Sequence, residues 1–135
     1  EVALAESQGS LVAESARLAA LRDRLVDGLA AEAPSMVETV ARSRKVAGSA
    51  HVMFPGIENE AILFLLDEAG LCASAASACA SGAMAPSHVL AAMGVPRRLA
   101  GGSLRLTLGR TTTEDDIARA VPTIPGAVHR LRPGS

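Results

Sequence analysis

The apolar positions in the first part of the chain predict one long amphipathic helix that ends near Pro34. Charged residues such as Arg17 and Asp23 fall on its other faces. The leucines that recur at helical spacing are Leu11, Leu18, Leu21, Leu25 and Leu29. An apolar stripe of this kind is typical of a helix that packs along one side against a core.

Four short segments are expected to be strands. Met36–Val40 and Ala50–Phe54 carry β-branched or alternating apolar residues between clusters of Pro, Gly and Ser, and Leu71–Ala73 is a short apolar run. Ser103–Leu108 gives the clearest pattern, because leucine alternates strictly with polar residues there. We therefore expect its leucines on a buried face and Arg105 on a polar face.

Three further helices are expected. One has Glu58 and Glu60 in its first turn and Gly70 at its C-terminal cap, and a short one lies between Pro86 and Gly94. The last begins after Thr113, which precedes three acidic residues, and Pro122 and Pro125 are expected to kink or split it. The order α-β-β-α-β-α-β-α predicts an α+β fold, a small, mostly antiparallel sheet covered by helices.

Composition excludes several classes of function. The 135 residues are 49% apolar and 20% charged, which fits one globular domain. With two Phe, no Trp, no Tyr and a net charge of −1, the chain offers neither stacking platforms nor a basic field for nucleic acid. The longest apolar run, Ala61–Leu66, is too short to cross a membrane. Five cations are expected to be solvated surface charges, namely Arg22, Arg24, Arg42, Arg44 and Lys45.

The two cysteines differ in their sequence surroundings. Six residues separate Cys72 from Cys79, which matches no metal site, and so few cysteines indicate reduced thiols, as in a cytoplasm. Cys72 follows Leu71 in an apolar run and is expected in the core as a small hydrophobe. Cys79 lies in residues 73–82, a stretch of Ala, Ser and Gly that cannot bury it. Composition alone leaves an inert surface thiol and a functional thiol open for Cys79.

Arg105 is the second candidate for a functional role. On the polar face of an apolar strand its guanidinium can form two hydrogen bonds with a carboxylate, and a structural salt bridge is the alternative. The histidines are His51 on a strand, His88 in a short helix and His129 near the end of the chain. Their spacing suggests neither a catalytic pair nor a metal site, so we expect no metal.

A longer pattern resembles one enzyme family. Residues 73–94, ASAASACASGAMAPSHVLAAMG, and residues 101–117, GGSLRLTLGRTTTEDDI, join a Ser-Ala-Cys loop, a Ser-His-Val-Leu helix, an arginine strand and a Thr-plus-acid helix start. This order resembles the C-terminal part of the NifS/IscS-like cysteine desulfurases, in the class V aminotransferase family. The likeness is firm over Val46–Leu131. It implies a linking helix over 1–34 and, over 35–135, a small domain like the C-terminal domain of fold-type I pyridoxal-phosphate-dependent transferases, with the catalytic-cysteine loop at about 74–86.

The resemblance also implies roles for both candidates. The family's loop cysteine, here Cys79, takes sulfur from L-cysteine as a persulfide and leaves L-alanine. The family's strand arginine, here Arg105, anchors the substrate carboxylate. The sulfur then passes to an iron-sulfur scaffold or another acceptor protein, and the long loop resembles that of the group that hands it over directly. The family uses pyridoxal 5'-phosphate and is homodimeric, mainly through a large domain.

The chain departs from the family pattern at several positions. Ala75 and Ala76 stand where the family has Thr or Ser and then Gly, and Asn59 replaces a common Gly. The family's Schiff-base lysine lies in the large N-terminal domain, and the single lysine here, Lys45, is in no such motif. We therefore expect the isolated chain to lack the cofactor and to be inactive alone, as a part of a longer enzyme. A stand-alone persulfide-carrying or scaffold-binding module and a selenocysteine lyase-like relative are the alternatives.

Overall fold

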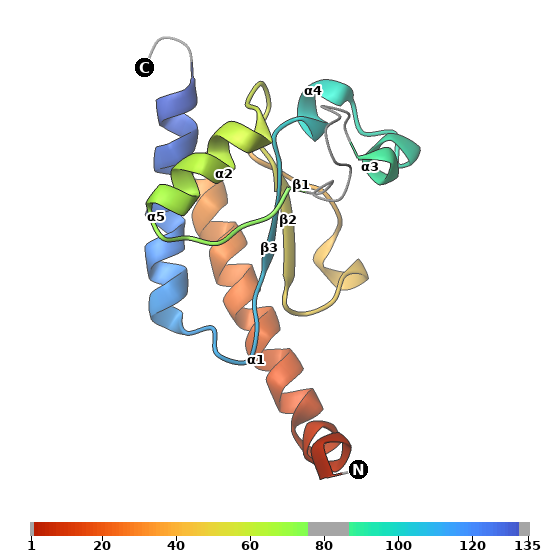
Figure 1. The fold of residues 1–135 in the computed structure, drawn as a ribbon. Coiled ribbons are helices and arrows are strands. Elements are labelled where there is room, and N and C mark those ends of the chain that lie inside the picture. The colour runs from red at the N-terminus through yellow and green to blue at the C-terminus, as the bar shows by residue number, and fades with distance from the viewer. Residues whose placement is uncertain (1, 76–86, 133–135) are drawn as a thin grey trace.

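The structure is a computed structural model, and it describes residues 2–75 and 87–132, with side chains from residue 11 on. Cys79 and the segment around it lie outside the described residues. The described part contains an antiparallel sheet of three strands in the order β1-β2-β3 (Figure 1). The strands are β1 (Val37–Glu38), β2 (Ser49–Met53) and β3 (Ser103–Thr107). This arrangement confirms the predicted α+β class.

The helices are α1 (Val2–Glu32), α2 (Asn59–Glu68), α3 (His88–Ala92), α4 (Arg97–Ala100) and α5 (Glu114–Leu131), with a short 3-10 turn, η1 (Arg42–Arg44). Helices α1 and α5 run side by side on one side of the sheet, and α2 packs against α5 (Figure 1). Helices α3 and α4 lie beyond the other side (Figure 1). The sequence pattern predicted all of these α-helices except α4.

The core forms between the sheet and the helices on its covered face. Alternation along the strands turns Val52, Leu104 and Leu106 inward, and each is buried. Helices α1, α2 and α5 contribute the facing side chains, among them Leu25, Leu29, Ile62, Leu66, Ile124 and Val128. The predicted buried face of Ser103–Leu108 is therefore confirmed.

Only part of α1 packs against this core. Leu21, Leu25 and Leu29 are buried, whereas Leu11 is 63% exposed. The N-terminal end of α1 projects beyond the rest of the described chain (Figure 1). The leucine stripe predicted the helix correctly, but its first member does not contribute to the core.

Helix α5 is continuous, so the expectation that its prolines split it is wrong. Pro122 and Pro125 both lie inside the helix and lack the N–H groups that would bond to earlier carbonyl groups. The hydroxyl of Thr123 donates to the carbonyl of Arg119 at 2.6 Å, which adds a hydrogen bond in the same turn. Pro125 is itself buried, so packing of this face holds the helix together across both prolines.

The strand predictions need two corrections. The expected strand Met36–Val40 is only two residues long, although the backbone N–H of Thr39 still donates to the carbonyl of His51. Leu71–Ala73 is not a strand, and pairing with β3 is limited to an isolated bridge between Ser74 and Arg105.

Candidate functional site

Arg105 lies near the middle of β3 with its side chain on the face of the sheet opposite α1 and α5. Alternation buries Leu104 and Leu106 on either side and leaves the Arg105 side chain exposed. Its backbone N–H donates to the carbonyl of Ser74 at 2.7 Å, and its carbonyl accepts from the N–H of Ser74 at 3.1 Å. The side chain reaches the same residue, because Nη2 donates to Ser74 Oγ at 3.3 Å. Ser74 is thus fixed to Arg105 by backbone and side-chain contacts. The alternation of apolar and polar residues predicted the polar position of Arg105, whereas no sequence pattern predicted its contact with Ser74.

Arg105 differs in its partners from several other arginines of the chain. Within the ranges 2–75 and 87–132, no acidic side chain forms an ion pair with it. Arg17, Arg24 and Arg42, in contrast, each bind a carboxylate. The structural salt bridge that we weighed for Arg105 is therefore not found among the described residues, and its guanidinium keeps hydrogen-bond donors for another anion.

His51 stands directly opposite Arg105 on β2, on the same face of the sheet. Its ring Nδ1 lies 2.6 Å from the hydroxyl oxygen of Thr39. Partial burial lowers the pKa of the His51 imidazole below its usual value, and the positive charges of Lys45 and Arg105 lower it further. The ring is therefore neutral at neutral pH.

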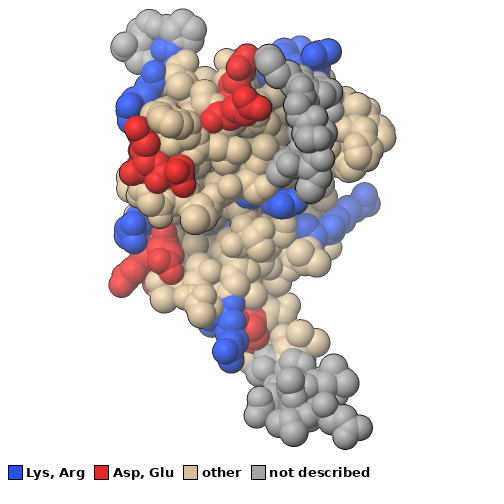
Figure 2. All heavy atoms as spheres, in the orientation of Figure 1, with Lys and Arg blue, Asp and Glu red and all other residues tan. Residues whose placement is uncertain are grey.

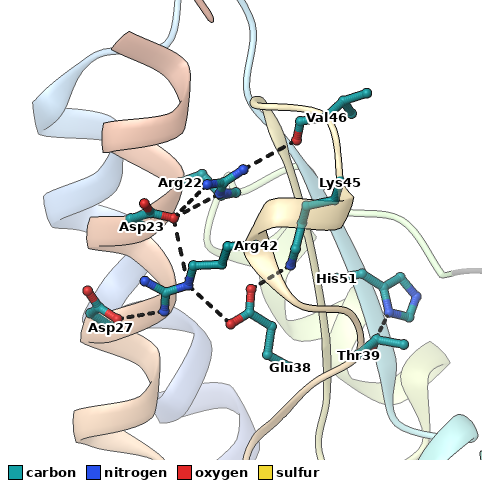
Figure 3. A network of polar contacts seen from close by, with 9 residues as sticks. All are labelled: Arg22, Asp23, Asp27, Glu38, Thr39, Arg42, Lys45, Val46 and His51. Carbon is teal, nitrogen blue, oxygen red and sulfur yellow. Dashed lines mark hydrogen bonds and ion pairs between the residues drawn. The ribbon is translucent and has the colours of Figure 1, made fainter. Parts of the chain in front are cut away.

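A polar network joins α1 to the segment that leads into β2 (Figure 3). Arg22 is 5% exposed, binds Asp23 at 2.8 Å and donates to the carbonyl of Val46. Arg42 bridges Asp27 and Glu38, and Lys45 also binds Glu38. The hydrogen bond from Arg42 lowers the pKa of the Asp27 carboxyl. The expectation of solvated surface charge is thus wrong for Arg22, because its guanidinium is satisfied by partners within the fold.

Acidic and basic side chains are otherwise interspersed over the face of the molecule drawn in Figure 2. Neither sign forms a single broad field there. This distribution agrees with the small net charge of −1.

Cys72 is exposed, so its predicted place in the core is wrong. The backbone after Gly70, which has a positive φ of 72°, does not continue as a strand beside β3. Cys72 instead lines a cleft of about 220 Å³ between β3, the start of α5 and the segment after α2. Arg105 is not among the residues that line this cleft.

The other two histidines lie on helices and not on the sheet. His88 begins α3, and His129 lies in the last turn of α5. Within the described part of the chain, no group of three or more His, Cys, Asp or Glu side chains is arranged to hold a metal ion. Helices in that same part are all too short or too polar to cross a membrane.

No family model matches the chain. Among curated proteins, it is 50% identical over 119 residues to an IscS-like cysteine desulfurase of Mycobacterium tuberculosis, covering 87% of this chain and 30% of the relative. It is 41% identical over 119 residues to the cysteine desulfurase NifS of Azotobacter vinelandii, covering 88% of this chain and 30% of the relative. It is 42% identical over 132 residues to the cysteine desulfurase IscS of Methanosarcina thermophila, covering 98% of this chain and 31% of the relative.

Solved structures show the same relationship. A NifS-like protein superposes with a TM-score of 0.78 at 26% identity over 93% of this chain and 31% of that protein. A NifS-like protein of Rickettsia africae has a TM-score of 0.74 at 20% identity over 90% of this chain, which shows a shared fold. The chain is thus a relative of the NifS- and IscS-like cysteine desulfurases and spans about 30% of their length.

Proposed function

We propose that this chain is the C-terminal small domain of a longer cysteine desulfurase and supplies two of its functional groups. Cys79 accepts sulfur from L-cysteine, and Arg105 binds the carboxylate of that substrate. The relatives named cysteine desulfurase support the reaction class, and their greater length supports a larger whole. The sequence motif around each residue supports its individual role.

One observation carries most of the proposal. Arg105 has exposed donors, no acidic partner among the described residues, and direct bonds to Ser74. Ser74 begins the segment that contains Cys79, five positions further along the chain. Because five residues span at most about 18 Å, the backbone of Cys79 is tethered within that reach of Ser74. A carboxylate binder and a thiol so linked suit a small thiol-containing acid.

The overall reaction balances without an added oxidant. The sulfur of Cys79 forms a bond to the sulfur of L-cysteine as the carbon–sulfur bond of the substrate breaks. The electron pair of the broken bond stays with the substrate carbon, which takes up a proton to give L-alanine. The two thiols thereby become one persulfide on Cys79 and one methyl group on the product. The persulfide sulfur then passes to an iron-sulfur scaffold or another acceptor protein.

The binding site for pyridoxal phosphate is part of this proposal and lies in the remainder of the longer enzyme. Lys45, the single lysine of the sequence, binds Glu38 and is held in the network of Figure 3. It cannot serve as the Schiff-base lysine without breaking that ion pair. When bound, the cofactor would act as an electron sink for substrate carbons, and its binding residues would belong to the remainder of the enzyme.

The test uses the full-length protein that contains this chain. Cys79→Ser should abolish alanine and persulfide formation from L-cysteine while the cofactor absorbance persists, because serine lacks the nucleophilic sulfur. Cys72→Ser is the matched control, since Cys72 is the other thiol of the chain and is exposed. It should retain the activity. Unchanged alanine formation in Cys79→Ser would overturn the role of Cys79.

Arg105 is tested separately by its effect on substrate binding. Arg105→Ala should raise the KM for L-cysteine much more than it weakens cofactor binding, because it removes a charge-assisted pair of hydrogen bonds worth about 2–4 kcal/mol. Equal loss of cofactor and substrate binding would instead indicate a structural arginine.

A further inference from the structure

We propose that His51 is a second residue of the anion site at Arg105 and donates a hydrogen bond from Nε2 to the same substrate carboxylate. This inference rests on the proposed function and deepens it. It assigns the recognition of the carboxylate to two neighbouring strands rather than to Arg105 alone. Thr39 is the residue that positions the His51 ring for this contact.

Four polar residues form a row across the face of the sheet opposite α1 and α5. His51 and Arg105 are directly opposite each other on β2 and β3. On one side of this pair the N–H of Thr39 donates to the carbonyl of His51, and on the other Ser74 is bridged to Arg105. Directly opposite residues of antiparallel strands have their Cβ atoms about 5 Å apart, so one small anion can contact both side chains.

The orientation of the His51 ring is fixed by Thr39. The 2.6 Å contact joins the Thr39 hydroxyl to Nδ1, and in Figure 3 the other ring nitrogen lies on the far edge of the ring from Thr39. When the hydroxyl donates to Nδ1, the single proton of the neutral ring resides on Nε2. That tautomer presents a hydrogen-bond donor on the edge of the ring that Thr39 leaves open.

The electrostatic surroundings of the row favour an anion. The charged groups that act on His51 are Lys45 and Arg105, and both are cationic. Glu38, the acidic residue near Lys45, has its carboxylate occupied by Arg42 and Lys45. His51 therefore faces net positive charge with its donor available, and a carboxylate placed there meets the Arg105 guanidinium and the imidazole N–H together.

The experiment compares two His51 variants of the full-length protein. His51→Leu removes the donor, and His51→Gln keeps an amide N–H at a similar reach. Thr107→Val is the matched control, because Thr107 is exposed on the same face of β3, one row away. For each variant we would measure the kcat and KM for L-cysteine. We would also measure the Kd for 3-mercaptopropionate, which keeps the thiol and carboxylate, and for cysteamine, which lacks the carboxylate.

His51→Leu should raise the KM and the 3-mercaptopropionate Kd by about tenfold, because a hydrogen bond to a charged group is lost. The kcat and the cysteamine Kd should stay within about twofold, and His51→Gln should restore most of the binding. Thr107→Val should match the wild type. Thr39→Val should weaken 3-mercaptopropionate binding to an intermediate degree, because the ring loses its positioning contact.

Three outcomes would overturn the inference. If the wild type desulfurates cysteine and binds 3-mercaptopropionate but His51→Leu behaves like it, the role of His51 is wrong while the proposed function stands. An equal weakening of cysteamine would likewise show that His51 is structural. If the wild type neither desulfurates cysteine nor binds 3-mercaptopropionate, the proposed function fails, and the inference fails with it.

Discussion

Gly102 is the position where a single added methyl group should disturb the strand of Arg105 most directly. It immediately precedes β3, and its carbonyl accepts from the N–H of the fully buried Phe54 at 3.0 Å. A Cβ atom at Gly102 would lie 2.0 Å from the carbonyl oxygen of Phe54 and 2.9 Å from that of Ile57. Both contacts are with backbone atoms, which cannot turn away as a side chain can.

The cost of Gly102→Ala follows from this geometry. Ordinary contact starts at 3.4 Å, so the distance must open by 1.4 Å (3.4 − 2.0) between the end of β2 and the start of β3. Overpacking of this kind costs about 1–3 kcal/mol, and loss of the Phe54 hydrogen bond adds about 1 kcal/mol. We therefore expect the free energy of unfolding to fall by about 2–4 kcal/mol.

Urea denaturation provides the measurement, with Gly126→Ala as the matched control. Gly126 lies inside α5 with no atom within 4 Å of an added Cβ, so alanine there should raise the free energy of unfolding by up to about 1 kcal/mol. The two variants add the same methyl group and should shift the urea midpoint in opposite directions. A Gly102→Ala midpoint within error of the wild type, at an unchanged slope, would refute the steric reasoning.

The remaining predictions concern a helix cap, a titrating ring and a buried cation. Thr113→Ala removes the hydroxyl that accepts from the N–H of Asp116, while the bond from the backbone N–H of residue 113 to the Asp116 carboxylate remains. The change should cost about 1 kcal/mol in urea, whereas no loss would mean that the hydroxyl cap is dispensable. The lowered pKa of His51 means that the unfolded chain binds its proton first as the pH falls below 6.5. The wild type should therefore lose stability between pH 7 and 5 relative to His51→Gln, and parallel curves would contradict this. Arg22→Met should cost only about 1 kcal/mol, because the Asp23 side chain is 40% exposed and stays hydrated, and a loss above about 3 kcal/mol would show a stronger network.

Regular alternation and helical spacing predicted the elements whose burial is one-sided. β3 and α5 are examples, because each turns a continuous apolar stripe toward the core. The same rules failed at Leu71–Ala73, where a short apolar run satisfies a strand pattern but does not pair with the sheet, and only the following residue, Ser74, forms a bridge to Arg105. Three residues carry too little periodicity to decide between a strand and an irregular segment. The wrong expectation of a buried Cys72 follows from that wrong strand prediction, because Cys72 is exposed.

The candidate site was predictable in its chemistry and not in its contacts. The polar position of Arg105 follows from alternation within β3 alone. The neighbours of Arg105 have two origins. Strand register places His51 opposite Arg105, and tertiary pairing brings Ser74 alongside it. No local pattern encodes a register between segments about 30 to 50 residues apart. For the same reason the burial of Arg22 could not be predicted from the sequence, which shows only that the residue is charged.

The central claim is that Cys79 carries sulfur taken from L-cysteine, and mass spectrometry of the Cys79 peptide tests it most directly. The full-length protein is incubated with L-cysteine labelled with a heavy sulfur isotope, alkylated and digested. The account predicts one labelled sulfur atom added to the Cys79 peptide and none on the Cys72 peptide, with one alanine formed per persulfide in a single turnover. Alanine formation with an unmodified Cys79 peptide, or with the label on Cys72, would contradict the account.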